Sequence, residues 1–294
     1  MLQTTGLLFG TVQLQDKVAI ITGAGRGTGR AIALAYAREG AHIVAVARTL
    51  EEIQQTAQEV QGLGRRALAV RADVSRNSEV EAMVSAALGE FGRIDILVNC
   101  AGVYGPIGPL GVLDPEEWLQ TIAVNLGGTF HCCRAVLPAI IRQRYGRIIN
   151  LSGGGATAPR PNFSAYAVSK AAVVRLTETL AEEVRPYGIQ VNAIAPGGVN
   201  TRLIDAVLTA GEAAGKEALE EAKRLKAGQG TPPEEVAALA VFLASDASQG
   251  LTGRLISVVW DDWRSMASRI DRIMASDFYT LRRTVPQAQR QPCR

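Results

Sequence analysis

The sequence predicts an α/β fold in which helices cover both faces of a doubly wound, parallel β-sheet. Short β-branched runs alternate with longer helix-like stretches along the chain, which is typical of β-α units. Such alternation requires helices on both faces, because right-handed crossovers connect the parallel strands. The chain has 294 residues, of which 47% are hydrophobic and 20% are charged. This composition excludes a disordered or collagenous chain, and the length suits one domain of roughly 250 residues with tails.

Seven strands are expected, and helical sequence follows each of the first six. The first strand, KVAIIT, ends at a glycine-rich turn, and a helix-like stretch is under way by Ala31. The fourth strand is followed by helical sequence up to Arg144. The expected strands span residues 17–22, 43–47, 67–72, 94–99, 147–151, 189–194 and 255–259, and the other expected helices span residues 50–60, 79–91, 165–185 and 234–244.

Three regions are expected along the chain: an N-terminal leader (1–14), the α/β domain (15–260) and an Arg-rich C-terminal extension (261–294). Neither an internal repeat nor a low-complexity linker divides the domain. Its residues 201–228 are rich in Ala, Glu, Lys and Leu, and we expect a mobile helical lid beside a ligand there. The extension is expected to pack on the body or on a neighbouring subunit, and a dedicated binding surface is the alternative.

Charge and cysteine content limit the classes of function that the sequence allows. The formal net charge is +3, but residues 264–294 contribute +5 and leave −2 for the body, which is not expected to bind nucleic acid. The four cysteines form no C-x-x-C pattern with a second pair or with histidines, so neither a disulfide framework nor a metal site is predicted. Because the sequence has no secretory signal and no run of about 18 apolar residues, a cytoplasmic protein without membrane contact is expected.

The turn after the first strand predicts a phosphate site. It reads Thr22-Gly23-Ala24-Gly25-Arg26-Gly27-Thr28-Gly29. Glycines let the backbone turn tightly and approach a pyrophosphate, and the N–H groups at the start of the next helix attract the anion. A turn that is merely tight is the alternative, but the position between strand and helix favours a dinucleotide.

The end of the second strand favours a phosphorylated dinucleotide. An acidic residue usually stands there and binds the ribose 2′-OH, whereas this chain has Ala47 and Arg48. A guanidinium pairs bidentately with a 2′-phosphate, which a carboxylate would repel. Arg26 is expected to add a second positive charge at the same corner. NADP(H) is therefore the predicted preference, with NAD(H) as the alternative.

Tyr166 and Lys170 form a candidate acid/base pair. A spacing of four residues puts both side chains on one helix face. A nearby ammonium favours the phenolate and lowers a pKa that starts near about 10, as an acid/base group working near neutral pH requires. The alternative is an ordinary tyrosine and lysine on an amphipathic surface helix.

Together these residues resemble the short-chain dehydrogenase/reductase family over roughly residues 15–260. The glycine turn matches the family pattern T-G-x-x-x-G-x-G, and Tyr166-x-x-x-Lys170 matches its tyrosine and lysine. The resemblance implies a single-domain Rossmann fold with seven parallel strands. The further matches are Asp73-Val74, Asn99-Cys100-Ala101-Gly102 (the family's N-N-A-G, with Cys in the second place), Asn125 and Pro196-Gly197-x-Val199-x-Thr201.

The resemblance also implies an enzyme, an NAD(P)-dependent oxidoreductase that acts on a small carbonyl or secondary alcohol and forms a homodimer or homotetramer. Tyr166 would exchange a proton with the substrate oxygen while hydride moves between substrate and nicotinamide. Lys170 would bind the nicotinamide ribose, Asn125 would hold a relay water, and Ser152 would hydrogen-bond the carbonyl. The implied cofactor contacts are Gly23, Gly25, Arg26, Gly27, Thr28, Gly29, Arg48, Asp73, Val74, Asn99, Ala101, Gly102, Tyr166, Lys170, Pro196, Gly197, Val199 and Thr201.

Two other functions remain open. A family member that catalyses epimerisation or dehydration would retain its cofactor through the cycle. A dinucleotide-binding sensor or scaffold would use the C-terminal tail as a partner surface. The intact Tyr166, Lys170 and Asn125 argue against a sensor, which needs no proton relay.

Two departures from the family pattern concern the carbonyl-binding serine and the end of the fold with its subunit interface. The family's serine usually lies 13 residues before the tyrosine, where this chain has Gly153, and Ser152 lies one residue earlier. Either the glycines at 153–155 absorb an insertion and Ser152 still reaches the substrate oxygen, or the role is vacant and a backbone N–H or Ser164 substitutes; the first interpretation is favoured. The chain also reads VVWDDW at residues 258–263, where the family often has V-D-G-G. The candidate substrate neighbours are Tyr104, Arg160, Phe163 and Trp260, each with ordinary packing as the alternative.

Overall fold

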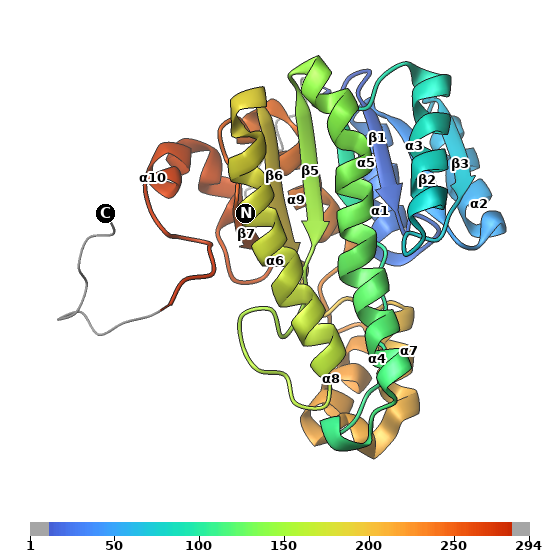
Figure 1. Ribbon diagram of the computed structural model, residues 1–294, viewed down its shortest axis with the longest axis vertical. Helices are drawn as coiled ribbons and strands as arrows, with labels where there is room; N and C mark the ends of the chain where they lie inside the picture. Colours follow the sequence, from blue (N-terminus) through green and yellow to red (C-terminus); the bar gives the residue numbers. More distant parts are fainter. Residues whose placement is uncertain (1–11, 284–294) are drawn as a thin grey trace, which may run out of the picture.

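A seven-stranded parallel sheet runs through the centre of the computed structural model, which describes residues 12–283 (Figure 1). The strand order is β3-β2-β1-β4-β5-β6-β7, so the direction of winding reverses between β1 and β4. This confirms the predicted doubly wound fold. The strands are β1 (Val18–Thr22), β2 (His42–Ala47), β3 (Ala67–Arg71), β4 (Ile96–Asn99), β5 (Gly146–Leu151), β6 (Ile189–Ala195) and β7 (Leu255–Ser257).

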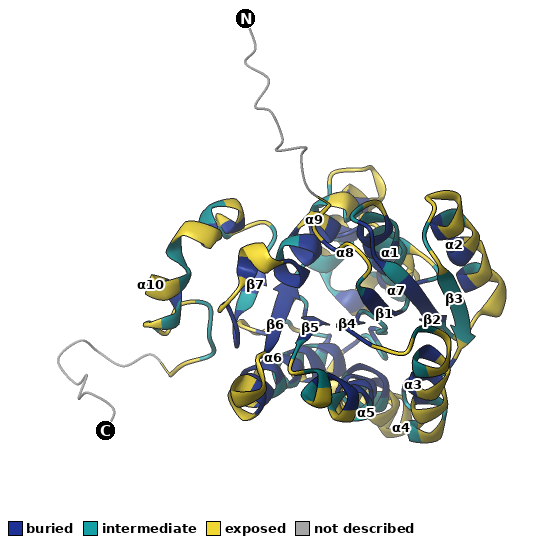
Figure 2. Cartoon of the chain, turned by 90° about the horizontal axis from the view of Figure 1, so that it is seen from above, coloured by how far each residue is buried: buried dark blue, intermediate teal, exposed yellow. Residues whose placement is uncertain are grey.

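Helices cover both faces of the sheet, and the central strands between them are buried, whereas the edge strand β3 is only partly buried (Figure 2). In β1, Ala19 and Ile21 pack into the core under α1, α2 and α9, while Val18 and Ile20 pack into the core under α3, α5 and α6. Burial on both faces explains why the strands read as continuous apolar runs. The helices are α1 (Gly27–Arg38), α2 (Leu50–Gly62), α3 (Asn77–Phe91), α4 (Pro115–Ile122), α5 (Gly128–Gln143), α6 (Ser164–Val184), α7 (Arg202–Ala210), α8 (Lys216–Lys226), α9 (Pro233–Ala244) and α10 (Ile270–Met274).

Among the predicted boundaries that differ from the structure, two have a local hydrogen-bonding cause. Helical sequence was expected directly after the fourth strand, but α4 begins only at Pro115, because the Asp114 carboxylate accepts a hydrogen bond from Glu117 N (2.8 Å) and caps the helix there. The seventh strand ends at Ser257 instead of residue 259. Ser257 N donates to the Asp261 carboxylate (2.7 Å), and this hydrogen bond turns the chain out of the sheet.

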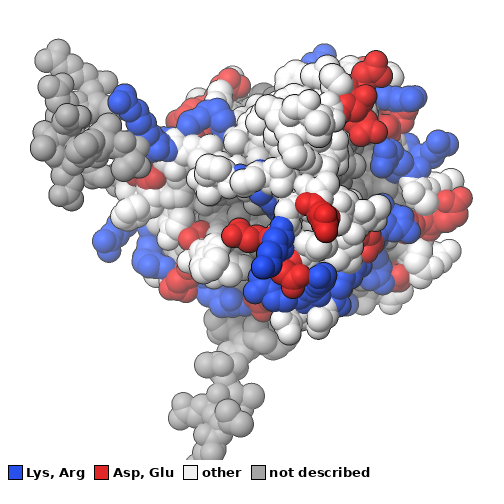
Figure 3. Space-filling model, turned by 90° about the horizontal axis from the view of Figure 1, so that it is seen from below, with Lys and Arg blue, Asp and Glu red and all other residues white. Residues whose placement is uncertain are grey.

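Helices α7 and α8 lie at the carboxyl ends of the strands, at the bottom of Figure 1. They correspond to the segment 201–228 that was expected to be helical. Seen from this end, acidic and basic side chains are interspersed (Figure 3). Lys226 Nζ lies 2.5 Å from an Asp205 oxygen, which ties the two helices together.

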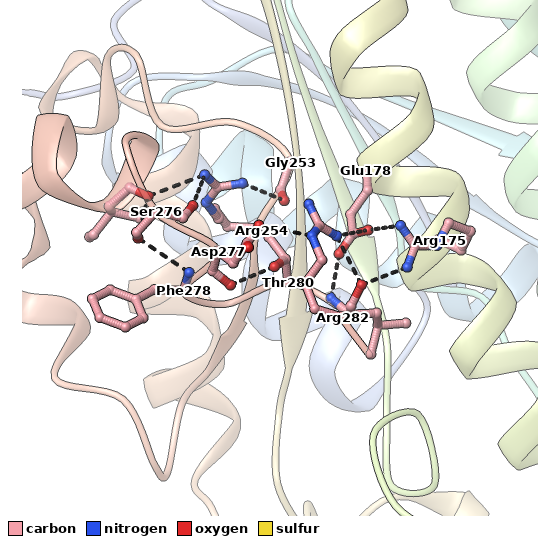
Figure 4. Close-up of polar contacts among 11 residues, drawn as sticks. Arg175, Glu178, Gly253, Arg254, Ser276, Asp277, Phe278, Thr280 and Arg282 are labelled. Atoms are coloured by element: carbon pink, nitrogen blue, oxygen red, sulfur yellow. Dashed lines mark hydrogen bonds and ion pairs between the residues drawn. The ribbon is translucent and has the colours of Figure 1, made fainter. Parts of the chain in front are cut away.

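The described part of the C-terminal extension packs on the body. Trp263, Met266 and Ile273 are buried in the same apolar core as α9. Beyond α10, Arg282 lies against the buried carboxylate of Glu178 on α6, at 3.1 Å, and Figure 4 shows Arg175 on the other side of that carboxylate. Most of the predicted leader (1–11) and the end of the extension (284–294) lie outside the described residues.

One helical stretch, Pro115–Gln143, is long and apolar enough to cross a membrane by length and composition alone. Half of its apolar window is buried inside the fold, as is usual for a core helix.

Candidate active site

A groove of 660 Å³ opens at the carboxyl ends of the strands, over the point where the winding reverses. Ligands of open α/β sheets bind at this position. The structure brings twelve of the predicted cofactor residues together in its walls. They are Gly23, Gly25, Arg26, Gly27, Thr28, Gly29, Arg48, Asp73, Val74, Ala101, Gly102 and Thr201.

The glycine turn forms a cradle of bare backbone at the start of α1. A side chain at position 29 would overlap the carbonyl oxygen of Gly23, and a Cβ at position 23 would lie 3.0 Å from Ala101 N. The Thr22 hydroxyl accepts hydrogen bonds from Cys100 N (3.0 Å) and Ala101 N (3.1 Å), which fixes the turn against the end of β4. Only glycine fits these two positions, and the first residues of α1 line the groove, where N–H groups at a helix start can bind a phosphate.

Arg26 and Arg48 both line the groove but differ in their surroundings. Arg26 was expected to offer a free positive charge, but its Nη1 lies 2.7 Å from Glu52 Oε1, and Arg202 lies 3.6 Å from the same oxygen. Glu52, on α2, was not anticipated from the sequence, where the only signal is an acidic residue in a first helical turn. Arg48 is exposed and has no ion pair within residues 12–283.

Asp73 lies beside Arg48 in the groove wall. Burial raises the pKa of its carboxyl, but hydrogen bonds from Ser75 and the nearby Arg48 guanidinium outweigh this and hold the pKa below its usual value. Asp73 is therefore a charged hydrogen-bond acceptor at neutral pH.

Tyr166 and Lys170 lie one turn apart on α6, beyond the inner end of the groove. The Lys170 ammonium donates to the carbonyl oxygen of Leu151 (2.8 Å) and lies 5.6 Å from the centre of the Tyr166 ring. Burial lowers the pKa of Lys170 to about 8 and raises the pKa of Tyr166 well above its usual value. The Tyr104 ring stands edge-on to Tyr166 at 4.6 Å and separates it from the groove.

Asn125 connects the loop after β4 to α6. It lies in a π-helical turn, Ala123–Gly127, between α4 and α5, and such turns are common at functional sites. Its side chain accepts from Val103 N and donates to Val103 O and Ser169 Oγ, all at 2.9 Å. Ser169 was not anticipated, although it stands directly before the lysine of the motif.

Ser152 and Gly153 follow β5 and lie against α6. The Ser152 hydroxyl donates to the carbonyl oxygen of Lys170 (3.4 Å), and no hydrogen bond within residues 12–283 joins it to Tyr166. The residue beside the Tyr166 hydroxyl is Gly153, where any side chain would overlap the phenol oxygen. Ser164, the other candidate, accepts a hydrogen bond from Trp118 Nε1 (3.0 Å).

Comparisons with known proteins agree on one family. A sequence model described as short chain dehydrogenase matches residues 17–210. The short-chain reductase protein NovJ of Streptomyces niveus is 42% identical over 245 residues, which cover 83% of this chain and 93% of NovJ. The chain belongs to the short-chain dehydrogenase/reductase family.

Solved structures of this family superpose on the chain. The crystal structure of levodione reductase has a TM-score of 0.78 and 31% identity, covering 86% of this chain and 100% of that one. The structure of NAD+-bound xylitol dehydrogenase has a TM-score of 0.77 and 30% identity, covering 83% and 98%. Membership in the short-chain dehydrogenase/reductase family confirms the predicted oxidoreductase class and NAD(P) as the cofactor class. The bare-backbone cradle and the groove over the winding reversal fit such a dinucleotide.

The remaining predicted cofactor residues of this short-chain dehydrogenase lie outside the groove walls. The Asn99 side chain donates to Asn150 Oδ1 (2.9 Å) inside the sheet. Pro196, Gly197 and Val199 lie in the connection from β6 to α7, and Val199 is buried in the core. Trp260 is 87% exposed in the turn after β7, whereas Tyr104 and Phe163 share an apolar cluster with Tyr166 and with residues of α7 and α8.

Proposed function

We propose that this short-chain dehydrogenase interconverts a carbonyl and a secondary alcohol, with NADP(H) as its preferred cofactor. The observation that carries the proposal is the position of Tyr166 and Lys170, which are both buried and lie one turn apart on α6, beyond the inner end of the groove. A buried phenol beside an ammonium can exchange a proton with a substrate oxygen. When bound, the nicotinamide supplies or accepts the hydride.

Tyr166 is the acid/base residue of this mechanism. In reduction its hydroxyl proton goes to the substrate oxygen, and in oxidation the phenolate takes the proton back. The positive charge of Lys170 stabilises the phenolate that reduction leaves behind. Because burial keeps the phenol protonated in this structure, the resting site is prepared to donate a proton, as reduction requires.

The other site residues position the loop after β4 and would bind the cofactor. Asn125 keeps the loop after β4 at a fixed distance from α6, through its bonds to Val103 and Ser169. The glycine turn and the first N–H groups of α1 would bind the pyrophosphate. Arg48 would bind the 2′-phosphate, because its guanidinium lies in the groove wall without a competing carboxylate bonded to it. Arg26 contributes less, since Glu52 already neutralises it.

The experiment is a screen of ketones, aldehydes and secondary alcohols with NADPH and NADP+, followed by the change in NADPH absorbance. The proposal expects one NADPH oxidised for each carbonyl reduced. Substrate turnover without net NADPH consumption would favour an epimerase or dehydratase instead. Binding of NADPH without turnover of any substrate would favour a sensor.

A further inference from the structure

A single arginine stands on the substrate side of the catalytic tyrosine. Arg160 lies in the loop between β5 and α6, with its guanidinium carbon 4.3 Å from the centre of the Phe163 ring and 5.3 Å from that of Tyr104. Its side chain is only 21% exposed. Since Tyr104 in turn contacts Tyr166 edge-on, one aromatic ring separates the guanidinium from the catalytic phenol.

The Arg160 guanidinium and the Tyr166 hydroxyl also border the same backbone segment, at Gly153 and Gly154. Arg160 Nη1 lies 3.0 Å from the point where a side chain at Gly154 would begin, and the preceding residue, Gly153, touches the Tyr166 hydroxyl. Adjacent Cα atoms are about 3.8 Å apart. The guanidinium and the phenol oxygen therefore border one short stretch of backbone without side chains. At this position the Arg160 charge lowers the pKa of Tyr166, although burial has the larger effect and raises it.

The hydrogen-bonding capacity of Arg160 is unused by the described residues. A guanidinium has five N–H donors, yet within residues 12–283 its side chain makes no hydrogen bond. The nearest carboxylate is that of Glu221 on α8, at 3.7 Å and about half exposed. Because the side chain is 21% exposed, these donors remain accessible, and a ligand can use them.

We propose that Arg160 binds a carboxylate of the substrate, and that the substrates are oxo acids or the corresponding hydroxy acids. This inference rests on the proposed carbonyl chemistry. The planar guanidinium matches a carboxylate in two parallel hydrogen bonds. One guanidinium carries a single positive charge, which matches a carboxylate better than a doubly charged phosphate. The apolar side chains of Ile204, Val207 and Leu225 on the lid helices would contact the carbon skeleton.

Glu221 competes with the substrate in this arrangement. Its ion pair with Arg160 is long and partly exposed, and such pairs are weak. A substrate carboxylate can therefore replace it while Glu221 turns to solvent. Removing the Glu221 charge should favour acidic substrates.

The test compares oxo acids with their methyl esters, which share the carbon skeleton and the reacting carbonyl. For the wild type we expect a higher kcat/KM for the acid. Arg160→Met should lower the ratio of acid to ester kcat/KM by about 10- to 100-fold, as expected for loss of a charge-assisted contact. Glu221→Gln should raise this ratio above that of the wild type. Arg160→Lys should keep part of the preference for the acid that Arg160→Met loses. Arg224→Met, which removes an exposed arginine from α8, is the matched control and should leave it unchanged.

A binding measurement separates this proposal from the proposed function. Calorimetry with phenylacetate and phenylacetamide needs no turnover; the wild type should prefer the carboxylate, and Arg160→Met should lose the preference. If phenylacetate binding depends on Arg160 while no carbonyl compound is reduced, only the proposed function fails.

The carboxylate site is overturned if the acid-to-ester ratio is unchanged in Arg160→Met or if phenylacetate and phenylacetamide bind equally. An equal fall of kcat for acid and ester would also overturn it, since Arg160 would then act on Tyr166. Unchanged thermal unfolding and NADPH affinity of each variant confirm its folding.

Discussion

Gly153 and Tyr166 lie against each other beyond the inner end of the groove, and the phenol oxygen fills the space in which a side chain at position 153 would begin. The position of the catalytic oxygen therefore depends on the absence of a side chain one residue after β5 and Ser152. Ser152 itself is turned toward the backbone of α6. These contacts determine the expected effects of substitutions at Ser152 and Gly153 on kcat.

Ser152→Ala should lower kcat less than about tenfold, because its hydroxyl bonds the Lys170 carbonyl. Gly153→Ala should lower kcat by about 100-fold, since a Cβ there would displace the phenol, and a shift of about 1 Å in a reacting group can cost that much. Steady-state kinetics at saturating NADPH measure both. The reverse ranking would return Ser152 to the role of carbonyl hydrogen-bond donor expected from the sequence.

Tyr166→Phe should lower kcat by about 10²- to 10⁴-fold, because only the transferable proton is lost. The Kd of NADPH should change by less than about threefold, since the ring keeps its shape. Tyr187→Phe, at a half-exposed tyrosine after α6, serves as the control. Near-normal turnover of Tyr166→Phe on any substrate would remove Tyr166 from the mechanism.

Arg48→Ala should weaken NADP(H) binding by about 10- to 100-fold, through loss of a charge-assisted phosphate contact. Arg48→Asp should invert the preference in favour of NAD(H). Arg26→Ala should have a smaller effect, because Glu52 already pairs with Arg26. Calorimetry with both cofactors measures these changes, with Arg76→Ala outside the groove as the control. Equal or tighter binding of NAD(H) by the wild type contradicts the assignment.

The rate of carbonyl reduction should fall as the pH rises through about 8. Burial lowers the pKa of Lys170 to about this value, so the ammonium that stabilises the phenolate is present below this pH and lost above it. Lys170→Arg should abolish the decline, because a guanidinium stays charged. A kcat profile between about pH 6 and 10 tests this, and the same decline in Lys170→Arg would assign it to another group.

Glu178→Ala should lower the free energy of unfolding by about 1–3 kcal/mol. Its buried carboxylate accepts from Leu281 N (2.6 Å) and pairs with Arg175 and Arg282, so its removal detaches the C-terminal segment from α6. Glu182→Ala removes an exposed ion pair with Arg185 and should change stability by less than about 1 kcal/mol. Urea unfolding of both variants measures the difference, and equal effects would show that the segment adds little stability.

Features that depend on local spacing could be predicted from the sequence. The order of strands and helices, the glycine turn at residues 22–29 and the shared helix face of Tyr166 and Lys170 all follow from patterns within a few residues. Backbone geometry repeats every two residues in a strand and about every 3.6 in a helix. Such patterns determine which side chains share a face, and chain connectivity then places the glycine turn at the edge of the sheet where ligands bind.

The directions and partners of individual side chains were decided only by the tertiary structure. Glu52 neutralises Arg26 from a different β-α unit, and Glu178 binds Arg282 from more than a hundred residues away. The orientation of Ser152 depends on how closely α6 packs on β5. These contacts join segments that no short pattern relates, because packing of whole helices and strands against one another decides which distant atoms come within hydrogen-bonding distance.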